Sequence, residues 1–392
     1  MRSSELARES IKHGSSIIIG FLFILLLRPY FTWQNALPGI GFIFFSIFIF
    51  KKNHFYSHYF LSALLLIVYI GIRLLRSNLT VSSLLLFFLI PIMLSDDDRK
   101  IQFYYRTKRV YSVIIGFSLL VYFCVVFCGF ELNNNVIDPW NEEKTYQYSQ
   151  YPFLVVPYNA KDILLQFRFF SLFEEPGIVG SIAASFLTAE KFNLKNWQNI
   201  IIFLSGIFSF SMFFYVITLS LMCYFGRMKM ITIAIFVFLV LMSAITYYSK
   251  SDFSIKNLYD VRFAHQEGAF VGDNRSTESF DKVFAEFVNS GDFFIGRGLG
   301  SHDKIDQVQS YKMVVYDEGF IMFMWEIVVF FTYFFSIPQL KFKTKIISFV
   351  YFLLYYYQRP SFVLCAGDFF LLLCIPLLIQ VRGYRYSERQ LY

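Results

Sequence analysis

The sequence predicts an all-α polytopic integral membrane protein, a single transmembrane domain over residues 1–392 with about 12 transmembrane helices. Of the 392 residues, 56% are hydrophobic, 21% are aromatic and only 16% are charged. A soluble domain cannot bury so much apolar surface, so this composition indicates a chain that crosses a bilayer many times. Apolar runs close to the roughly 20 residues that one span requires recur along the whole chain. They cover residues 14–31, 37–50, 59–75, 79–95, 110–130, 176–190, 230–248, 314–338, 344–358 and 361–380.

The apolar run 199–225 is long for one span and short for two. The positions of basic residues help to choose between one span and two, because short loops rich in lysine and arginine favour the cytoplasmic side. They place both termini and the segment 99–109 inside, which requires an even number of spans. We therefore expect two short helices that turn near residues 209–211, with 131–170 and 249–312 as two larger outer loops. A single long span would instead put 249–312 in the cytoplasm.

Charge and cysteine content exclude several classes of function. The formal net charge is +7, but the basic residues lie in short loops between apolar runs, so we expect no nucleic-acid partner. The five cysteines fall inside apolar runs without histidines at ligand spacing, which predicts core residues, no metal and no cofactor. Arg73 and Arg76 disagree with the charge pattern, because they border an outer loop. They either snorkel to the interface or serve the site.

The first outer loop ends on an arginine followed by two carboxylates at the start of an apolar run. Arg168 precedes Glu174 and Glu175, and Pro176 suits the first turn of the helix that follows. Acidic residues at this position stabilise the positive end of a helix dipole, and on that interpretation Arg168 is an interfacial anchor. On the functional interpretation, Arg168 binds a phosphate while a carboxylate acts as general base or orients a sugar hydroxyl.

The second outer loop contains a polar segment, residues 274–319, between long apolar runs. Apolar residues at helical spacing predict an amphipathic helix over residues 277–289, capped by Ser276 or Thr277. Its basic side chains indicate an enzyme that acts on a phosphate-bearing lipid. They are Arg275, Lys282, Arg297, Lys304 and Lys312.

Three glycines alternate with other residues in the stretch 296–300 of this polar segment. Gly296, Gly298 and Gly300 allow close approach of a ligand to the backbone, and the N–H groups of such a loop can bind an anion. A plain tight turn explains the same pattern. No dinucleotide fingerprint is expected, because the surrounding sequence lacks a βαβ context.

Further ionisable residues lie at or within predicted spans. Asp317 and Glu318 open one apolar run, where carboxylates are either dipole partners or catalytic groups. His302 could titrate near neutral pH, although a lone loop histidine is more often solvated. Arg359 lies between the last two spans, and Asp368 lies within the final one and requires a partner, for which we expect a basic residue.

In order and spacing, these elements resemble bacterial O-antigen polymerases (the Wzy family), which form a superfamily with O-antigen ligases and exopolysaccharide polymerases. The resemblance is detailed over roughly residues 160–330. It implies metal-independent, inverting glycosyl transfer on the periplasmic face of the bacterial inner membrane, with both termini cytoplasmic. The growing glycan moves from undecaprenyl pyrophosphate to a hydroxyl of an incoming lipid-linked repeat unit. The implied partners are this lipid-linked oligosaccharide, a chain-length co-polymerase and a flippase.

The resemblance also assigns residues. Arg168 and Arg275 match the two outer-loop arginines, Glu175 matches the acid before the Pro-Gly pair, and the glycines match the turn. We expect catalytic roles for Arg168, Glu175, Arg275 and Glu318. We expect substrate binding by Arg297, Gly298, His302, Lys312, Asp317 and Arg359. The general base stays open among Glu175, Asp317, Glu318 and His302.

Two other functions remain as alternatives. The first is an O-antigen ligase, which in that branch carries a histidine shortly before the next span, whereas residues 309–312 read Gln-Ser-Tyr-Lys. The second is a flippase or another transporter of lipid-linked oligosaccharides. A transporter needs polar residues along its helix interiors, and these spans are almost wholly apolar. The sequence therefore favours the polymerase.

Overall fold

The protein is predominantly helical. The structure, a computed structural model, describes residues 17–50, 57–76, 81–140, 144, 146–159, 163–226, 232, 276–305, 308 and 310–380. Its helices include α2 (Leu37–Phe50), α3 (Phe60–Arg76), α4 (Val81–Leu85), α5 (Leu89–Leu94), α6 (Asp97–Tyr122), α7 (Ile163–Gln166), α8 (Pro176–Ala189), α9 (Trp197–Phe208), α10 (Met212–Tyr224), α13 (Glu278–Val288), α14 (Tyr311–Glu318), α15 (Phe320–Ser336), α16 (Phe342–Gln358) and α17 (Ala366–Gln380).

The first large loop contains a small sheet, which was not predicted from the sequence. The strands β1 (Asn135–Ile137), β2 (Gln147–Tyr151) and β3 (Leu154–Tyr158) pair antiparallel in the order β1-β2-β3. Tyr148 of β2 and Val155 of β3 are fully buried and pack in one cluster with Trp33. The described residues are therefore predominantly helical, as predicted, with one small added sheet.

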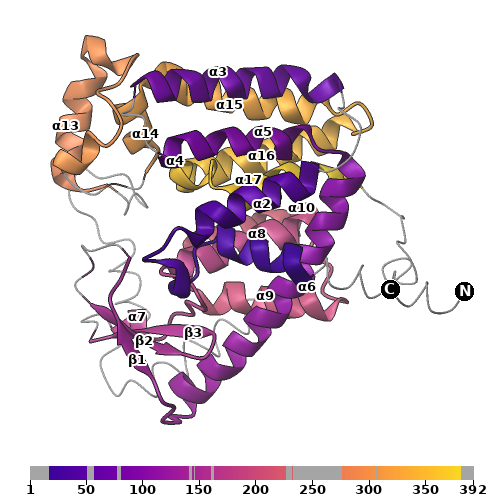
Figure 1. Ribbon diagram of the computed structural model, residues 1–392, viewed down its shortest axis with the longest axis vertical. Helices are drawn as coiled ribbons and strands as arrows, with labels where there is room; N and C mark the ends of the chain where they lie inside the picture. The colour runs from indigo at the N-terminus through magenta and orange to yellow at the C-terminus, as the bar shows by residue number, and fades with distance from the viewer. Residues whose placement is uncertain are drawn as a thin grey trace, which may run out of the picture.

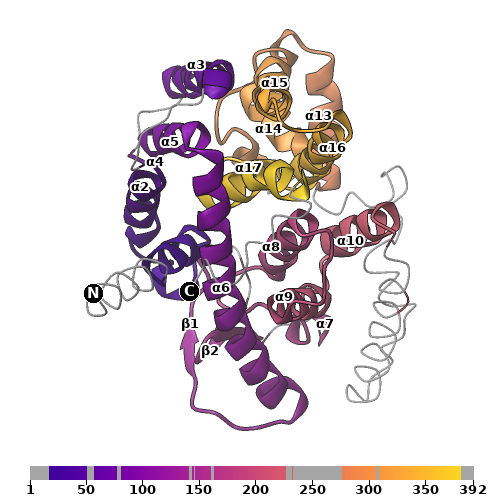
Figure 2. The same cartoon turned by 90° about the vertical axis from the view of Figure 1, so that its right-hand side faces the viewer.

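Most long helices run side by side with similar directions (Figure 1). Helix α15 packs against α3 and α16, and α17 packs against α8, α6 and α16. Helix α6 lies between α2 and α9 and contacts both of them (Figure 2). The core is rich in aromatic rings, as where Phe23 contacts Phe45, Phe186 and Phe370 from three other helices.

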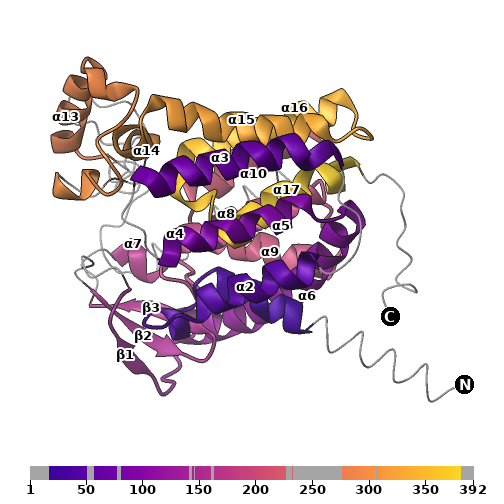
Figure 3. The ribbon, with the colours of Figure 1, turned by 45° about the horizontal axis from the view of Figure 1, so that its top comes forward.

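The two large loops lie at the same end of this bundle. The sheet and the α13–α14 segment both lie at the left in Figures 1 and 3, whereas the α5–α6 and α15–α16 connections lie at the opposite end. The bundle therefore has one end that carries polar subdomains and another that carries short turns.

Among the described residues, one helix, Asp97–Phe127, is long and apolar enough to cross a membrane by itself. Helices α14 and α15 meet the same criteria only as a pair, bent by 118° at Gly319. The predicted span 314–338 is thus two helices. Gly319 has φ of 89°, a left-handed conformation that breaks the helix there.

The segment 99–109, predicted as a cytoplasmic loop, forms the first turns of α6 instead. Asp96 caps this helix by accepting a hydrogen bond from the Asp98 N–H. Two of the basic residues are fully buried. The Nζ atom of Lys100 lies 4.1 Å from the centre of the Tyr59 ring, and the Nζ atom of Lys108 forms an ion pair with Glu190.

The run 199–225 forms two helices, α9 and α10, as predicted, with the break at residues 209–211. The turn packs closely on α8, because a Cβ at Gly180 would lie only 2.4 Å from the Ser211 Cβ. Apart from residue 232, the predicted span 230–248 and residues 249–275 lie outside the described residues.

The amphipathic helix predicted over residues 277–289 is α13. Thr277 is its N-cap, with its side chain accepting a hydrogen bond from the Phe280 N–H. Phe280 and Phe287 are fully buried and pack on the ring of Tyr316 in α14. The part of the apolar face of α13 that carries Phe280 and Phe287 is therefore covered by α14.

Candidate functional site

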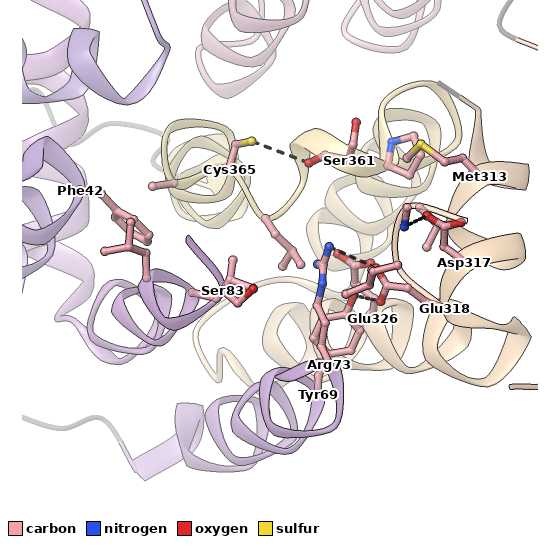
Figure 4. Close-up of a pocket in the computed structure, with 18 of the residues that line it drawn as sticks. Phe42, Tyr69, Arg73, Ser83, Met313, Asp317, Glu318, Glu326, Ser361 and Cys365 are labelled. Atoms are coloured by element: carbon pink, nitrogen blue, oxygen red, sulfur yellow. Dashed lines mark hydrogen bonds and ion pairs between the residues drawn. The ribbon is translucent and has the colours of Figure 1, made fainter. Parts of the chain in front are cut away.

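A cavity of about 480 Å³ opens between α3, α14, α15 and the segment that joins α16 to α17. Apolar side chains form much of its wall, among them those of Leu26, Phe42, Leu86, Val314 and Leu364. Its polar lining residues are Arg28, Tyr69, Arg73, Ser83, His302, Asp317, Glu318, Glu326, Ser361 and Cys365. Figure 4 shows Tyr69 and Arg73 extending from α3 toward Glu318 and Glu326.

Glu318, the last residue of α14, is bound by one face of α3. Its Oε1 lies 3.3 Å from Nη2 of Arg73, and its Oε2 accepts a 2.8 Å hydrogen bond from the Tyr69 hydroxyl. Arg76 donates a 2.6 Å hydrogen bond to the Glu318 carbonyl oxygen. Tyr69, Arg73 and Arg76 follow the i, i+4, i+7 spacing of one helix face, so α3 presents all three side chains toward Glu318.

The glycine loop binds an anion that belongs to the protein itself. Asp317 accepts hydrogen bonds from the Gly300 N–H at 2.8 Å and the His302 N–H at 3.0 Å, and its carbonyl oxygen accepts one from the Gly298 N–H. Gly296, Gly298 and Gly300 all have positive φ, as such an anion-binding loop requires. The loop therefore positions the Asp317 carboxylate, and these N–H groups are not free for a ligand.

His302 lies between two carboxylates beside the cavity. Its Nδ1 is 2.7 Å from Oδ2 of Asp317, and its Nε2 is 3.0 Å from Oδ1 of Asp303. Burial lowers the pKa of His302, but the hydrogen bond to Asp317 and the two negative charges raise it, and the net shift is upward. The imidazolium form is therefore stabilised, which makes His302 a weaker candidate for a general base.

Glu326 is a site residue that sequence reasoning missed. It lines the cavity, is only 3% exposed and accepts a 2.6 Å hydrogen bond from the Tyr356 hydroxyl through Oε2. Its Oε1 is buried and has no hydrogen-bond partner among the described residues. A single glutamate inside the apolar run 320–336 was the available signal.

Arg297 and Lys312, predicted to bind substrate, form contacts within the protein and are not among the residues that line the cavity. Arg297 donates a 2.8 Å hydrogen bond from Nη1 to the Tyr316 hydroxyl, and its guanidinium lies above the rings of Tyr316 and Phe287. Lys312 lies 2.8 Å from Asp281 of α13. Arg297 therefore connects the glycine loop to α14, and Lys312 connects α14 to α13.

A second charged cluster lies at the start of α8, where Pro176 begins the helix as predicted. Glu175 holds the N-cap position, but its side chain makes no capping hydrogen bond, and its Oε2 lies 3.5 Å from Nη2 of Arg359. Glu174 lies 3.4 Å from Lys144. Burial lowers the pKa of Lys144 while Glu174 and Glu175 raise it, and the net shift is downward.

Arg359 is buried against the first turn of α8. Arg359 is only 2% exposed, and its Nε and Nη1 atoms have no hydrogen-bond partner among the described residues. The guanidinium lies so close to α8 that a Cβ at Gly177 would be 1.9 Å from Nη2. Arg168 is nearby, because its charge acts on Lys144, and its Nε donates a 3.1 Å hydrogen bond to the Ser209 carbonyl oxygen.

The predicted site residues thus separate into two groups. His302, Asp317 and Glu318 line the cavity, with Gly298 in the adjoining loop. Arg168, Glu175 and Arg359 belong to the cluster at α8, and Arg275 lies outside the described residues. Asp368, for which we expected a basic partner, accepts a hydrogen bond from the Tyr355 hydroxyl instead.

No known protein family, curated protein or solved structure matches this chain. Among the described residues, no group of three or more histidine, cysteine, aspartate or glutamate side chains has the arrangement of a metal site.

Proposed function

We propose that this chain is a surface-polysaccharide (O-antigen) polymerase of the bacterial inner membrane. It transfers the growing glycan from undecaprenyl pyrophosphate to an incoming lipid-linked repeat unit. The observation that carries this proposal is the Glu318 carboxylate, held by Arg73 and Tyr69 in a cavity with both apolar and polar walls. Such a lining suits a substrate that joins a sugar and a phosphate to a hydrocarbon chain.

The proposal includes a membrane topology of about 12 spans with both termini cytoplasmic and both larger loops periplasmic. The position of the sheet and of α13–α14 at one end of the bundle supports it (Figure 3). Helices α9 and α10 have 12 and 13 residues. At 1.5 Å per residue each extends about 20 Å, less than the roughly 30 Å of a hydrocarbon core. On this topology they are two short spans that meet near the periplasmic interface, and the bilayer is locally thinner around them.

The proposed reaction is a metal-independent, inverting displacement. The Glu318 carboxylate takes the proton of the acceptor hydroxyl, and the oxygen forms a bond to the anomeric carbon of the donor. The bond from that carbon to the diphosphate oxygen breaks, and the electron pair leaves with the lipid diphosphate. Arginine is suited to bind this leaving group, and the two unpartnered nitrogens of Arg359 make it our choice in the α8 cluster.

A ligase, which would transfer finished glycan to another acceptor, is the second candidate. The sequence argument against it was the lack of a histidine at residues 309–312. In space, however, His302 lies at the cavity beside Asp317. This position favours keeping the ligase as an alternative. The sequence argument against a transporter was that the helix interiors lack polar residues. That argument is weaker in the folded protein, because Glu326 and Arg73 both lie within helices.

The test is a gel of lipopolysaccharide from a deletion strain complemented with wild type, Glu318→Gln or Lys282→Ala. Lys282 is an exposed residue in a surface pair with Glu278 and serves as the matched control. For a polymerase, the deletion and Glu318→Gln leave core plus one repeat, and the control restores the ladder. Loss of the single repeat as well would indicate a ligase or flippase, and an unchanged ladder in the deletion would overturn the proposal.

A further inference from the structure

The cavity contains three carboxylates in different surroundings. Asp317 uses both of its oxygens, because Oδ1 accepts from the His302 N–H and Oδ2 from the Gly300 N–H and the imidazole. Glu318 contacts the guanidinium of Arg73. Glu326 has no basic group within 4.0 Å among the described residues, and one of its oxygens is buried without a partner. The three groups therefore cannot share one role.

Each helix packed around Glu326 contributes a charged or titratable side chain. Helix α3 contributes Tyr69 and Arg73, α14 contributes Glu318, and α16 contributes Tyr356. The Tyr69 hydroxyl interacts electrostatically with both Glu318 and Glu326. The cluster thus has two carboxyl groups, two tyrosine hydroxyls and one guanidinium, and the guanidinium contacts Glu318.

Two carboxylates that share one buried site do not both ionise when a single cation compensates them. An ionised Glu326 would be a buried charge with one unsatisfied oxygen, which is costly. A neutral carboxyl group at the same place needs only a hydrogen-bond partner for its O–H. The Tyr69 hydroxyl oxygen can accept it, since Tyr69 donates its own proton to Glu318, whereas the Tyr356 hydroxyl already donates to the other oxygen of Glu326.

We infer that Glu326 is held in its neutral, protonated form and, through the Tyr69 hydroxyl, positions Glu318 as the ionised carboxylate that serves as the base. Glu326 is a positioning residue, because it acts through Tyr69 and not on the substrate. This inference rests on the proposed function for the role of Glu318, but not for the protonation of Glu326.

Infrared difference spectroscopy of the purified full-length protein tests the protonation without any assay of activity. We expect the carbonyl band of a protonated carboxyl group at neutral pH in wild type and its loss in Glu326→Gln. Tyr356→Phe removes the hydrogen bond to the same carboxyl group, so it should shift the frequency of that band. If Glu326→Gln does not fold, the shift in Tyr356→Phe assigns the band to Glu326. Carboxylate bands in place of the protonated band would overturn the inference.

Glycan ladders in the complemented deletion strain test the positioning. Glu326→Leu should shorten the glycan several-fold, and Glu326→Gln, a neutral group of the same shape, should restore long chains. In a Tyr69→Phe background, Glu326→Leu should cause no additional loss, because the connection to Glu318 is already broken. If Glu326→Gln is as defective as Glu318→Gln while the infrared band is absent, Glu326 is ionised and the inference fails. If the deletion leaves the ladder intact, the polymerase proposal fails, and the infrared result still decides the state of Glu326.

Discussion

Arg73 and Glu318 are separated by 245 positions in the chain and by 3.3 Å in the folded protein. Their contact attaches α3 to the bend between α14 and α15, and Tyr69 and Arg76 strengthen it from the same helix face. These contacts fix the Glu318 carboxylate in the wall of the cavity.

The first prediction concerns Arg73. Arg73→Ala leaves Glu318 with Tyr69 as its remaining partner and should destabilise the protein by about 1–3 kcal/mol, because a charged group that is 6% exposed loses its counter-ion. Arg73→Lys should retain part of this stability, since it keeps the charge but not the fork of the guanidinium. Thermal unfolding in detergent measures both. Lys282→Ala, on the surface, should leave unfolding unchanged, and equal losses in the two alanine variants would contradict the prediction.

The second prediction concerns the bend at Gly319. A Cβ there would lie 2.3 Å from the Ile295 carbonyl carbon, and the residue has φ of 89°. Gly319→Ala should therefore cost about 1–3 kcal/mol through backbone strain alone. Gly291→Ala is the matched control, because nothing lies within 4 Å of its Cβ. Similar unfolding temperatures for the two variants would show that the bend does not need glycine.

The third prediction is a pH dependence from His302. Its folded pKa is raised above the unfolded value of about 6.5, so the folded state binds the proton more tightly than the unfolded state. The stabilisation is fully present below about pH 6.5 and is lost as the pH rises through the folded pKa. The stability difference between wild type and His302→Gln should therefore narrow with rising pH. A difference that widens with pH would be the opposite result.

The fourth prediction is a coupling between Gly177 and Arg359. Gly177→Ala places a methyl group where the buried guanidinium lies, so it should destabilise the protein by pushing Arg359 away from Glu175. In an Arg359→Ala background the same substitution should cost much less, because the obstructing group is gone. Thermal unfolding of the four proteins gives the coupling free energy, and additive effects would show that the two residues do not interact.

Local features of the fold were predictable from the sequence because they depend on neighbours along the chain. Apolar spacing and a threonine cap define α13, a proline begins α8, and serines mark the break between α9 and α10. Each of these signals acts over one or two turns of helix, so a window of sequence contains it.

Much of the candidate site was not predictable, although His302, Asp317 and Glu318 were selected. Their partners were missed, because Tyr69 lies 249 positions from Glu318 and no local pattern joins them. The sequence left the glycine loop open between an anion-binding loop and a plain tight turn, and only the fold shows that its N–H groups bind the carboxylate of Asp317.

The sequence by itself determined a helical, strongly apolar chain with two polar segments, because composition and periodicity are summed over many residues. The tertiary structure alone decided which charges meet. The free energy of a buried charge depends on the one or two groups that face it, and these come from distant helices whose packing brings them within a few ångströms. For Glu318 and Glu326, the same side chain thus has two different environments.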